Sequence, residues 1–294
     1  MWGAALCNAM EEGVRIRTYH HEDEWVWLDQ EKCDMEEAKR SALSCYFPHA
    51  ELQCPQDFHD ASLGEPSSRI DLHNVSNPIK VKCDSIMPHY NKSDWRAAGA
   101  EHLFTHISPL VQKEGERQLN LVFSEDSAVP ANLITVHVRW GDKKFENKVY
   151  GIRKYIAAIE EIKQMRNDPP DAVTNVFLAT EDPEAVKAFE EETADSNYRL
   201  YLDQMYHDML PYRPVDPQMY NKVPHTSRKL KGRVGLWSLG SLLVAMEANA
   251  FVLTRTSNWS RLMDELRKTI LNPRCRNCTL MVDLSKDDPK FKEW

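Results

Sequence analysis

Three short polar segments hold the residues whose types and spacing could do chemistry. The first is His137-Val138-Arg139-Trp140-Gly141-Asp142-Lys143-Lys144-Phe145-Glu146, which follows a β-branched run. An arginine fork with lysines beside it suits a phosphate or pyrophosphate, because a guanidinium binds two oxygens at once. In this interpretation Asp142 orients Arg139 rather than facing the ligand. The alternative is a solvated turn with a surface salt bridge.

The second and third segments also contain groups that place or bind anions. Thr180-Glu181-Asp182-Pro183 puts two carboxylates before a predicted helix, where they either shape a site loop or cap the helix. Thr256-Ser257-Asn258-Trp259-Ser260-Arg261 precedes another predicted helix, whose N-terminus can receive an anion. Ser257 and Asn258 would add hydrogen bonds to phosphate oxygens, and an ordinary helix cap is the alternative.

A basic run lies between the second and third segments. It reads Ser227-Arg228-Lys229-Leu230-Lys231-Gly232-Arg233 and follows a proline-rich stretch. Four cations in this position could form a lid that closes over phosphate. The alternative is a solvated charged face.

The elements around these segments predict how they are positioned. Apolar runs at 133–138, 176–179 and 251–254 are typical of buried parallel strands. Helices are predicted after them, from an apolar stripe over 152–162, from Pro183 onward, over 236–249 and after Asn258. This alternation favours a doubly wound α/β domain, whose ligands bind where strands end and helices begin. The three polar segments follow these strands.

The first part of the chain, residues 1–125, has weak periodicity. Trp25-Val26-Trp27-Leu28 is a strand-like run within it. We therefore expect two domains, 1–125 and 126–294.

Composition excludes some classes of function. The formal net charge is −8, with 42% hydrophobic and 28% charged residues, so a globular core is expected and nucleic acid or anionic membrane is not an expected partner. No apolar run is long enough for a spanning helix, and the start lacks the features of a signal peptide. The chain is expected to be soluble inside cells or to be the body of a longer protein with an upstream anchor. Glycosylation sequons begin at Asn74, Asn91, Asn258 and Asn277 and permit a secretory setting.

The cysteines suggest local rather than metal chemistry. There are seven, five of them in the first third, and Cys275 and Cys278 form a CxxC near the end. No second cysteine pair and no histidines at ligand spacing follow, so the pattern favours a local disulfide or buried thiols over a zinc site.

Taken together, the three polar segments resemble the motifs of the alpha-1,6-fucosyltransferase family, which includes the core fucosyltransferase of N-glycans and the Nod-factor fucosyltransferases. The first motif stands as His137-Val138-Arg139-Trp140-Gly141-Asp142-Lys143, the second as 178–183 and the third as 257–261. Trp2-Gly3 is similar to the opening of the family's acceptor-side domain. The likeness is strongest from about 132 to 268.

The resemblance implies a GT-B-like α/β fold with an acceptor-side domain and a Rossmann-like donor domain. It implies an inverting transfer of fucose from GDP-fucose to a glycan or glycoprotein hydroxyl, without a metal or other cofactor. By position in the motifs it assigns roles to nine residues. Arg139 would bind the diphosphate and His137 and Lys143 would lie around the donor; Asp142 and Asp182 would hold their loops; Tyr155, Ser257 and Asn258 would lie at the phosphates; and Glu146 would be the general base.

The sequence also departs from the family pattern. The family's second arginine is Trp140 here, and Glu146 lies one residue closer to the Asp-Lys pair than the family's glutamate. The family's guanine-reading aspartate falls at Ser241 or Leu242. These departures leave open a different nucleotide-sugar donor, or a protein that binds glycan or nucleotide without turnover. The family places such enzymes in the Golgi or secretory lumen, with an anchor outside this sequence.

Overall fold

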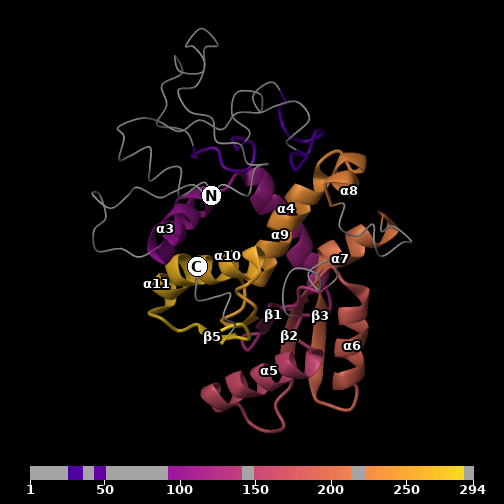
Figure 1. The fold of residues 1–294 in the computed structure, drawn as a ribbon, viewed down its shortest axis with the longest axis vertical. Coiled ribbons are helices and arrows are strands. Elements are labelled where there is room, and N and C mark those ends of the chain that lie inside the picture. Colours follow the sequence, from indigo (N-terminus) through magenta and orange to yellow (C-terminus); the bar gives the residue numbers. More distant parts are fainter. Residues whose placement is uncertain (1–25, 36–42, 51–91, 141–148, 213–222, 288–294) are drawn as a thin grey trace. The chain divides into compact units, whose positions relative to one another are not determined.

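The computed structural model of the chain describes residues 26–35, 43–50, 92–140, 149–212 and 223–287. The chain divides into two compact units, one made of residues 1–25 and 32–108 and the other of residues 26–31 and 109–294 (Figure 1). The assignment of 1–125 to an acceptor side and 126–294 to a donor side stays a prediction. No helix in the described ranges has the length and apolar character needed to cross a membrane.

The first unit is described over α3 (Lys92–Thr105) and two short segments before it. A disulfide joins Cys33 to Cys45, with a Cα–Cα distance of 5.6 Å. Phe47 packs edge-on against Phe104, with ring centroids 5.2 Å apart. These contacts tie the segment 43–50 to α3.

The second unit is built on a five-stranded sheet whose described strands are all parallel. Their order is β3-β2-β1-β4-β5, which is the order of Rossmann-type sheets. The strands are β1 (Ile134–His137), β2 (Thr174–Ala179), β3 (Tyr198–Leu202), β4 (Ala250–Leu253) and β5 (Leu280–Asp283). The fold is therefore α/β and compatible with the predicted Rossmann-like domain.

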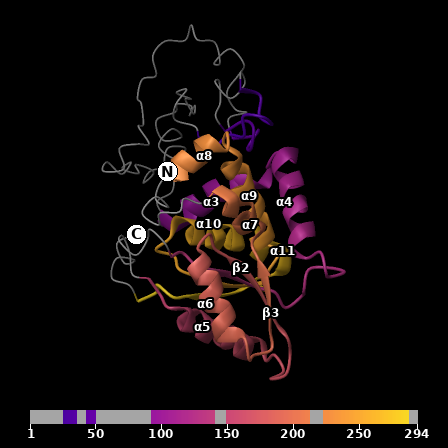
Figure 2. The same cartoon turned by 90° about the vertical axis from the view of Figure 1, so that its right-hand side faces the viewer.

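Helices connect successive strands. The described ones are α4 (Pro109–Val122), α5 (Ile152–Arg166), α6 (Pro183–Thr193), α7 (Gln204–Met209) with the 3₁₀ turn Leu210–Tyr212, α8 (Val223–Lys229), α9 (Arg233–Ala245), α10 (Asn258–Leu266) with the π turn Arg267–Leu271, and α11 (Asn272–Cys275). Helices α4 and α9 lie side by side in both views (Figures 1 and 2). Glycines allow this close packing: a Cβ on Gly115 would lie 2.6 Å from the Leu243 side chain.

The strand alternation separates two faces of the sheet. Ile134, Val136 and Val138 share one apolar cluster with Ile159 of α5 and Phe189 of α6. Each large apolar side chain buried there contributes roughly 1.5–3 kcal/mol. The opposite face holds the alternate residues of β1, and there the Thr135 hydroxyl donates to the Ala245 carbonyl at the end of α9, at 2.7 Å. The next residue on that face is His137, which the sheet thus directs toward α10.

The prediction that Trp25–Leu28 is strand-like is wrong for its described residues. Residues 26–28 form a turn and a bend, and Leu28 is buried. They pack against the start of α9, where Gly232 has a φ of 81° and an added Cβ would lie 1.7 Å from the Leu28 carbonyl oxygen. Apolar character here serves packing against a helix rather than a sheet, and periodicity cannot separate the two in so short a run.

The basic run 227–233 lies in α8 and the start of α9. Gln30 N–H donates to the Lys231 carbonyl at 2.9 Å, and the side chains of Lys231 and Arg233 both form ion pairs with Glu31. Two of the four cations expected in a phosphate lid are therefore engaged with residues 26–31.

Candidate functional site

The described residues of the predicted site segments follow strands β1, β2 and β4, and the strand order reverses between β1 and β4. From β1 the chain continues through α5 to β2 on one side, and from β4 it continues through α10 to β5 on the other. Strands β1 and β4 are neighbours, with Val136 opposite Val252. In open α/β sheets this topological switch point is where ligands bind, beyond the carboxyl ends of the strands.

His137 is the last residue of β1 and links the two strand ends. Its Nδ1 lies 2.7 Å from the Ser260 hydroxyl, and that same oxygen accepts the Thr254 N–H at 3.2 Å. A neutral imidazole carries one ring proton, so either Nδ1–H donates to Ser260 Oγ or the Ser260 hydroxyl donates to Nδ1 and Nε2 carries the proton. In the second tautomer the Nε2–H has no partner among the described residues.

The protonation state of His137 follows from its burial. The side chain is 6% exposed, and burial together with the nearby Arg139 charge lowers the pKa of His137 to about 3. The imidazole is therefore neutral at physiological pH. It presents one N–H donor at the end of β1, without carrying a positive charge of its own.

Tyr155 lies beneath the same loops. Its hydroxyl is 3.2 Å from the Thr254 Oγ1, and the residue is 1% exposed. Burial raises the pKa of Tyr155 to about 12, so the phenol stays protonated. Its predicted place at the phosphates stays a prediction; the described contact has it hold Thr254, the first residue after β4.

The N-terminus of α10 is open toward this switch point. Ser257 is its N-cap residue with extended backbone, φ −85° and ψ 135°, yet its side chain makes no capping hydrogen bond. The Ser257 hydroxyl has no partner in the described part of the chain, although the residue is only 8% exposed. Asn258 accepts a hydrogen bond from Arg261. The first amides of α10 thus keep their donor capacity for a ligand.

Other helices show the contrast. Asp182 caps α6 by accepting from Glu184 N–H at 2.9 Å, and Asp203 caps α7 by accepting from Met205 N–H at 3.0 Å. Capping is the structural role of Asp182, as the alternative interpretation of the second segment proposed. A part in donor binding stays a prediction for it.

Arg139 forms an ion pair with Glu181. Arg139 lies two residues past the end of β1 and Glu181 two residues past the end of β2, and those ends are paired, His137 opposite Ala179. The side chains are 21% and 43% exposed, so the pair sits at the surface of the site. A carboxylate therefore occupies the fork that we predicted to bind a phosphate.

Three predicted residues, Asp142, Lys143 and Glu146, lie outside the described residues. The two flanks of that segment are described: Trp140 Nε1–H donates to the Tyr150 carbonyl at 2.9 Å. This bond closes the loop between β1 and α5 at its base, and Trp140 and Tyr150 both pack on the main apolar cluster.

A buried ionic network that sequence reasoning missed holds the loop after β4. Arg255 Nε donates to Asp283 Oδ2 at 2.8 Å, and its NH1 donates to Asp264 Oδ2 at 3.2 Å. Arg267 bonds the other oxygen of Asp264 at 2.7 Å and the Thr279 hydroxyl at 2.9 Å. Asp264 is 2% exposed. The network fixes α10 and β5 against the switch point.

Neither comparison by sequence finds a relative. A scan against models of known protein families gives no match, and no curated protein matches the chain. The function proposed below therefore rests on the geometry of the switch point and on the motif resemblance.

Within the described ranges, His, Cys, Asp and Glu side chains form no group of three that could hold a metal ion. Cys275 and Cys278 are joined in a disulfide, which was one of the alternatives for this CxxC.

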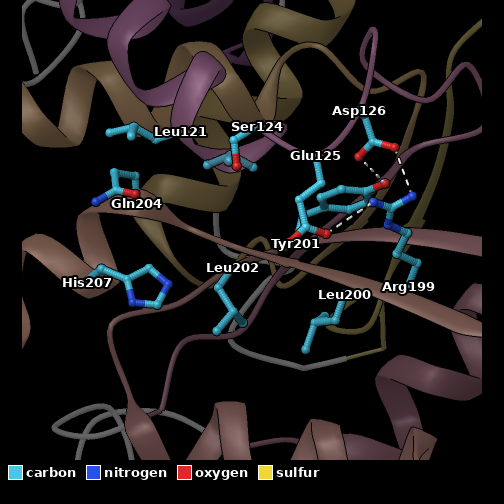
Figure 3. Close-up of a pocket in the computed structure, with 11 residues that line it drawn as sticks. Leu121, Ser124, Glu125, Asp126, Arg199, Leu200, Tyr201, Leu202, Gln204 and His207 are labelled. Atoms are coloured by element: carbon cyan, nitrogen blue, oxygen red, sulfur yellow. Dashed lines mark hydrogen bonds and ion pairs between the residues drawn. The ribbon is translucent and has the colours of Figure 1, made fainter.

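A separate cavity of about 280 Å³ lies at the edge strand β3, beside the end of α4 (Figure 3). Its charged groups are paired with one another. Arg199 contacts Asp126 at 2.8 Å and Glu125 at 3.7 Å, and Tyr201 OH donates to Asp126 Oδ2 at 3.0 Å. Because its charged side chains are engaged with one another, we do not assign this cavity a function.

Ser241, where the family's aspartate was expected, contacts a carboxylate from another element. Its hydroxyl donates to Asp203 Oδ2 at 2.6 Å, and both residues are buried. Burial raises the pKa of Asp203 to about 6, despite the opposing hydrogen bonds from Ser241 and Met205 N–H. An acidic group thus lies beside position 241 on a different strand end.

Asp203→Asn is expected to change the pH dependence of stability. Because the folded-state pKa lies above the ordinary value of 3.8, the native state binds the proton more tightly than the unfolded state. Wild-type stability is therefore expected to fall between about pH 4 and pH 6, by up to roughly 3 kcal/mol from this group. In the Asn variant this component disappears, and the variant gains on wild type as pH rises.

Urea unfolding at pH 4.5, 5.5, 6.5 and 7.5 measures this difference. Asp195→Asn, at an exposed aspartate, is the control for general charge effects. A constant offset between Asp203→Asn and wild type across the series would contradict the prediction.

Proposed function

We propose that the chain is an inverting glycosyltransferase that moves fucose from GDP-fucose to a hydroxyl of a glycan or glycoprotein. The observation that supports the proposal is a group of possible anion-binding donors at the switch point: Arg139, His137 in the tautomer with its proton on Nε2, the Ser257 hydroxyl and the N-terminus of α10. We refer to these groups as the switch-point site. They follow two neighbouring strands, β1 and β4, and the His137–Ser260 and Ser260–Thr254 hydrogen bonds link the two strand ends.

These groups suit a nucleoside diphosphate as leaving group. When the sugar–oxygen bond breaks, negative charge grows on the diphosphate, and donors already aimed at it stabilise the transition state without reorganising. Arg139 supplies a bidentate cation, and the amides of α10 supply fixed dipoles. The neutral His137 donates a hydrogen bond without drawing in a second counter-ion.

The other half of the reaction needs a base for the acceptor hydroxyl. Glu146 is the proposed base from its place in the first motif, with Lys143 beside the donor and Asp142 holding the loop. A GT-B-like arrangement would place the acceptor on the 1–125 side, across from the 126–294 donor domain. The Golgi or secretory lumen, with an anchor outside this sequence, is the proposed setting.

Two alternatives concern the same site. A donor with another base or sugar is favoured by Ser241 in place of the family's aspartate, although Asp203 contributes a carboxylate to Ser241. A protein that binds glycan or nucleotide without turnover is suggested by Trp140, whose indole is engaged with the Tyr150 carbonyl rather than supplying a charge.

Glu181→Gln is expected to strengthen nucleotide-diphosphate binding. Glu181 now competes with the ligand for Arg139, and a neutral amide competes less. We expect a gain of roughly 3- to 10-fold in affinity at low salt, which shrinks as salt screens the pair. Calorimetric titration at 50 and 300 mM salt measures it, with Glu192→Gln, from the exposed Arg153 pair, as the matched control. A loss of affinity in Glu181→Gln would mean that the carboxylate orients Arg139 for binding instead.

The proposed function is tested by titrating the purified chain with GDP, GDP-fucose, GDP-mannose, UDP and UDP-glucose. Selective binding of guanine nucleotides supports the proposal, and binding of uridine nucleotides selects the alternative donor. GDP release from GDP-fucose, with and without an N-glycan acceptor, then separates an enzyme from a binding protein. Absence of binding by all five ligands would overturn the proposal.

A further inference from the structure

We propose that Cys275 and Cys278 form a dithiol–disulfide exchange site whose reaction partners are dithiols. The pair occupies the connection between α11 and β5, and its Cα–Cα distance is 5.4 Å. This chemistry does not depend on the glycosyltransferase proposal.

The sulfurs are accessible to an attacking thiolate. Cys278 is exposed and Cys275 is half-buried, whereas in the other described disulfide Cys33 is 8% exposed and Cys45 is half-buried. Exposed disulfides are the ones that exchange readily, because attack requires a direct approach to sulfur. Of the two disulfides in the described residues, Cys275–Cys278 is therefore the more accessible.

The surroundings stabilise Cys275 as the leaving thiolate. The Cys278 N–H points at the Cys275 Sγ, with 3.1 Å between nitrogen and sulfur, and Arg274 and Arg276 flank the sulfur in sequence with exposed side chains. Hydrogen bonds and nearby cations lower the pKa of a thiol, and a low-pKa thiol leaves faster. The geometry therefore favours attack at Cys278 and departure of Cys275.

The backbone between the cysteines favours opening. Arg276 and Asn277, the two residues enclosed by the disulfide, both have positive φ, 55° and 63°. This left-handed conformation is unfavourable for a residue such as Arg276, asparagine adopts it more readily, and it usually occurs at single residues rather than at two in succession. The closed loop spans a sequence separation of 3, against 12 for Cys33–Cys45, and a short loop gains less from closure.

Exchange proceeds in two balanced steps. A thiolate of the dithiol attacks Cys278 Sγ, a mixed disulfide forms, the Cys275–Cys278 bond breaks and Cys275 leaves as a thiolate that takes a proton from solvent. The second thiolate of the dithiol then attacks the first dithiol sulfur, which is bonded to Cys278 in the mixed disulfide. This step releases Cys278 as a thiolate and oxidises the dithiol to a disulfide. A monothiol lacks this second step, and Cys275 would close the loop again because it is held close by.

The test incubates the oxidised full chain with reduced dithiothreitol, reduced glutathione or a reduced thioredoxin at equal thiol concentration and takes samples over time. Acid quenching, alkylation and peptide mass spectrometry read the two described disulfides separately, and circular dichroism follows the fold. We expect Cys275–Cys278 to be reduced at least 10-fold faster than Cys33–Cys45 by dithiols, with the fold unchanged, and glutathione to give little net reduction. Faster reaction with thioredoxin than with dithiothreitol at equal thiol would identify a protein dithiol as the partner, and equal rates a small one.

Two variants sharpen the result. Arg274→Gln with Arg276→Gln is expected to slow reduction by dithiols roughly 3- to 10-fold, because the leaving thiolate loses its cations. Arg153→Gln with Lys187→Gln removes two exposed cations elsewhere and is expected to have no effect. Reduction of both disulfides at one rate, or of Cys275–Cys278 only on unfolding, would overturn the proposal and make the pair a structural cross-link.

Discussion

Arg139→Ala is expected to lower GDP affinity and abolish measurable transfer while the chain stays folded. The guanidinium is the cation of the switch-point site, and removing one such donor from an oxyanion site costs roughly 100- to 1,000-fold in rate. Its ion pair with Glu181 lies at the surface, and surface ion pairs contribute at most about 1 kcal/mol, so the fold is expected to persist. Calorimetry with GDP and an assay of GDP release measure the two effects, and urea unfolding checks the fold.

The matched control is Arg199→Ala. Arg199 also belongs to this sheet unit and is also paired with carboxylates, Asp126 and Glu125, but at the β3 edge away from the switch point. Its loss is expected to leave GDP affinity unchanged. Equal losses in the two variants would point to a general charge effect, and wild-type binding by Arg139→Ala would remove the central claim about the site.

Asp264→Ala is expected to lower the free energy of unfolding by about 3–5 kcal/mol, because it leaves the cations around a buried position without their carboxylate partner. Asp264 is 2% exposed and is contacted by Arg255, Arg267 and Lys268. Breaking one side of a buried pair costs far more than removing an exposed pair. Urea unfolding at pH 7 measures the loss, and Glu192→Ala, from an exposed pair, is expected to stay within about 1 kcal/mol of wild type.

The same carboxylate has a defined pH dependence. Burial alone would raise the pKa of Asp264, but hydrogen bonds from Lys268 and Arg267 outweigh it and hold the pKa below the ordinary 3.8. The stabilisation is therefore complete above that value and is lost as pH falls through the lower folded-state pKa. The cost of Asp264→Ala is expected to shrink in strong acid. A variant that loses less than about 1 kcal/mol at pH 7 would show that Arg255 and Arg267 recover their hydration without Asp264.

The centre of the sheet could be predicted from sequence, and its edges could not. The runs 133–138, 176–179 and 251–254 coincide with the central strands β1, β2 and β4, which are mostly apolar and buried because both faces of the sheet are covered. Strands β3 and β5 lie at the sheet edges and are less fully buried: Arg199 of β3 is exposed and Tyr198 and Leu200 are half-buried, and the first two residues of β5 are half-buried. Helix α9 was predicted over 236–249 but spans Arg233–Ala245, since residues 246–249 turn back into β4.

The site was predictable to the extent that it depends on strand ends. His137, Arg139 and Ser257 could be predicted to follow neighbouring strands because parallel strands bring their carboxyl ends to one edge; their part in binding stays a prediction. The partnership of Arg139 with Glu181 could have been found as well, because both stand two residues beyond paired strand ends. The contacts Ser260–His137 and Asp203–Ser241 join side chains that are far apart in the sequence, and Arg255–Asp264 joins side chains nine residues apart. Residue spacing in the sequence does not predict these contacts.

The packing of residues 26–31 against the start of α9 has a consequence for synthesis. Glu31 and its partner Lys231 are 200 residues apart in the chain. At the usual 5–20 residues per second, the ribosome makes the partner about 10–40 s after it makes Glu31. During that interval the buried Leu28 has no glycine-lined helix to cover it. Residues 26–31 are thus synthesised early but can pack only after α9 has been made, so this unit cannot fold in strict order from the N-terminus.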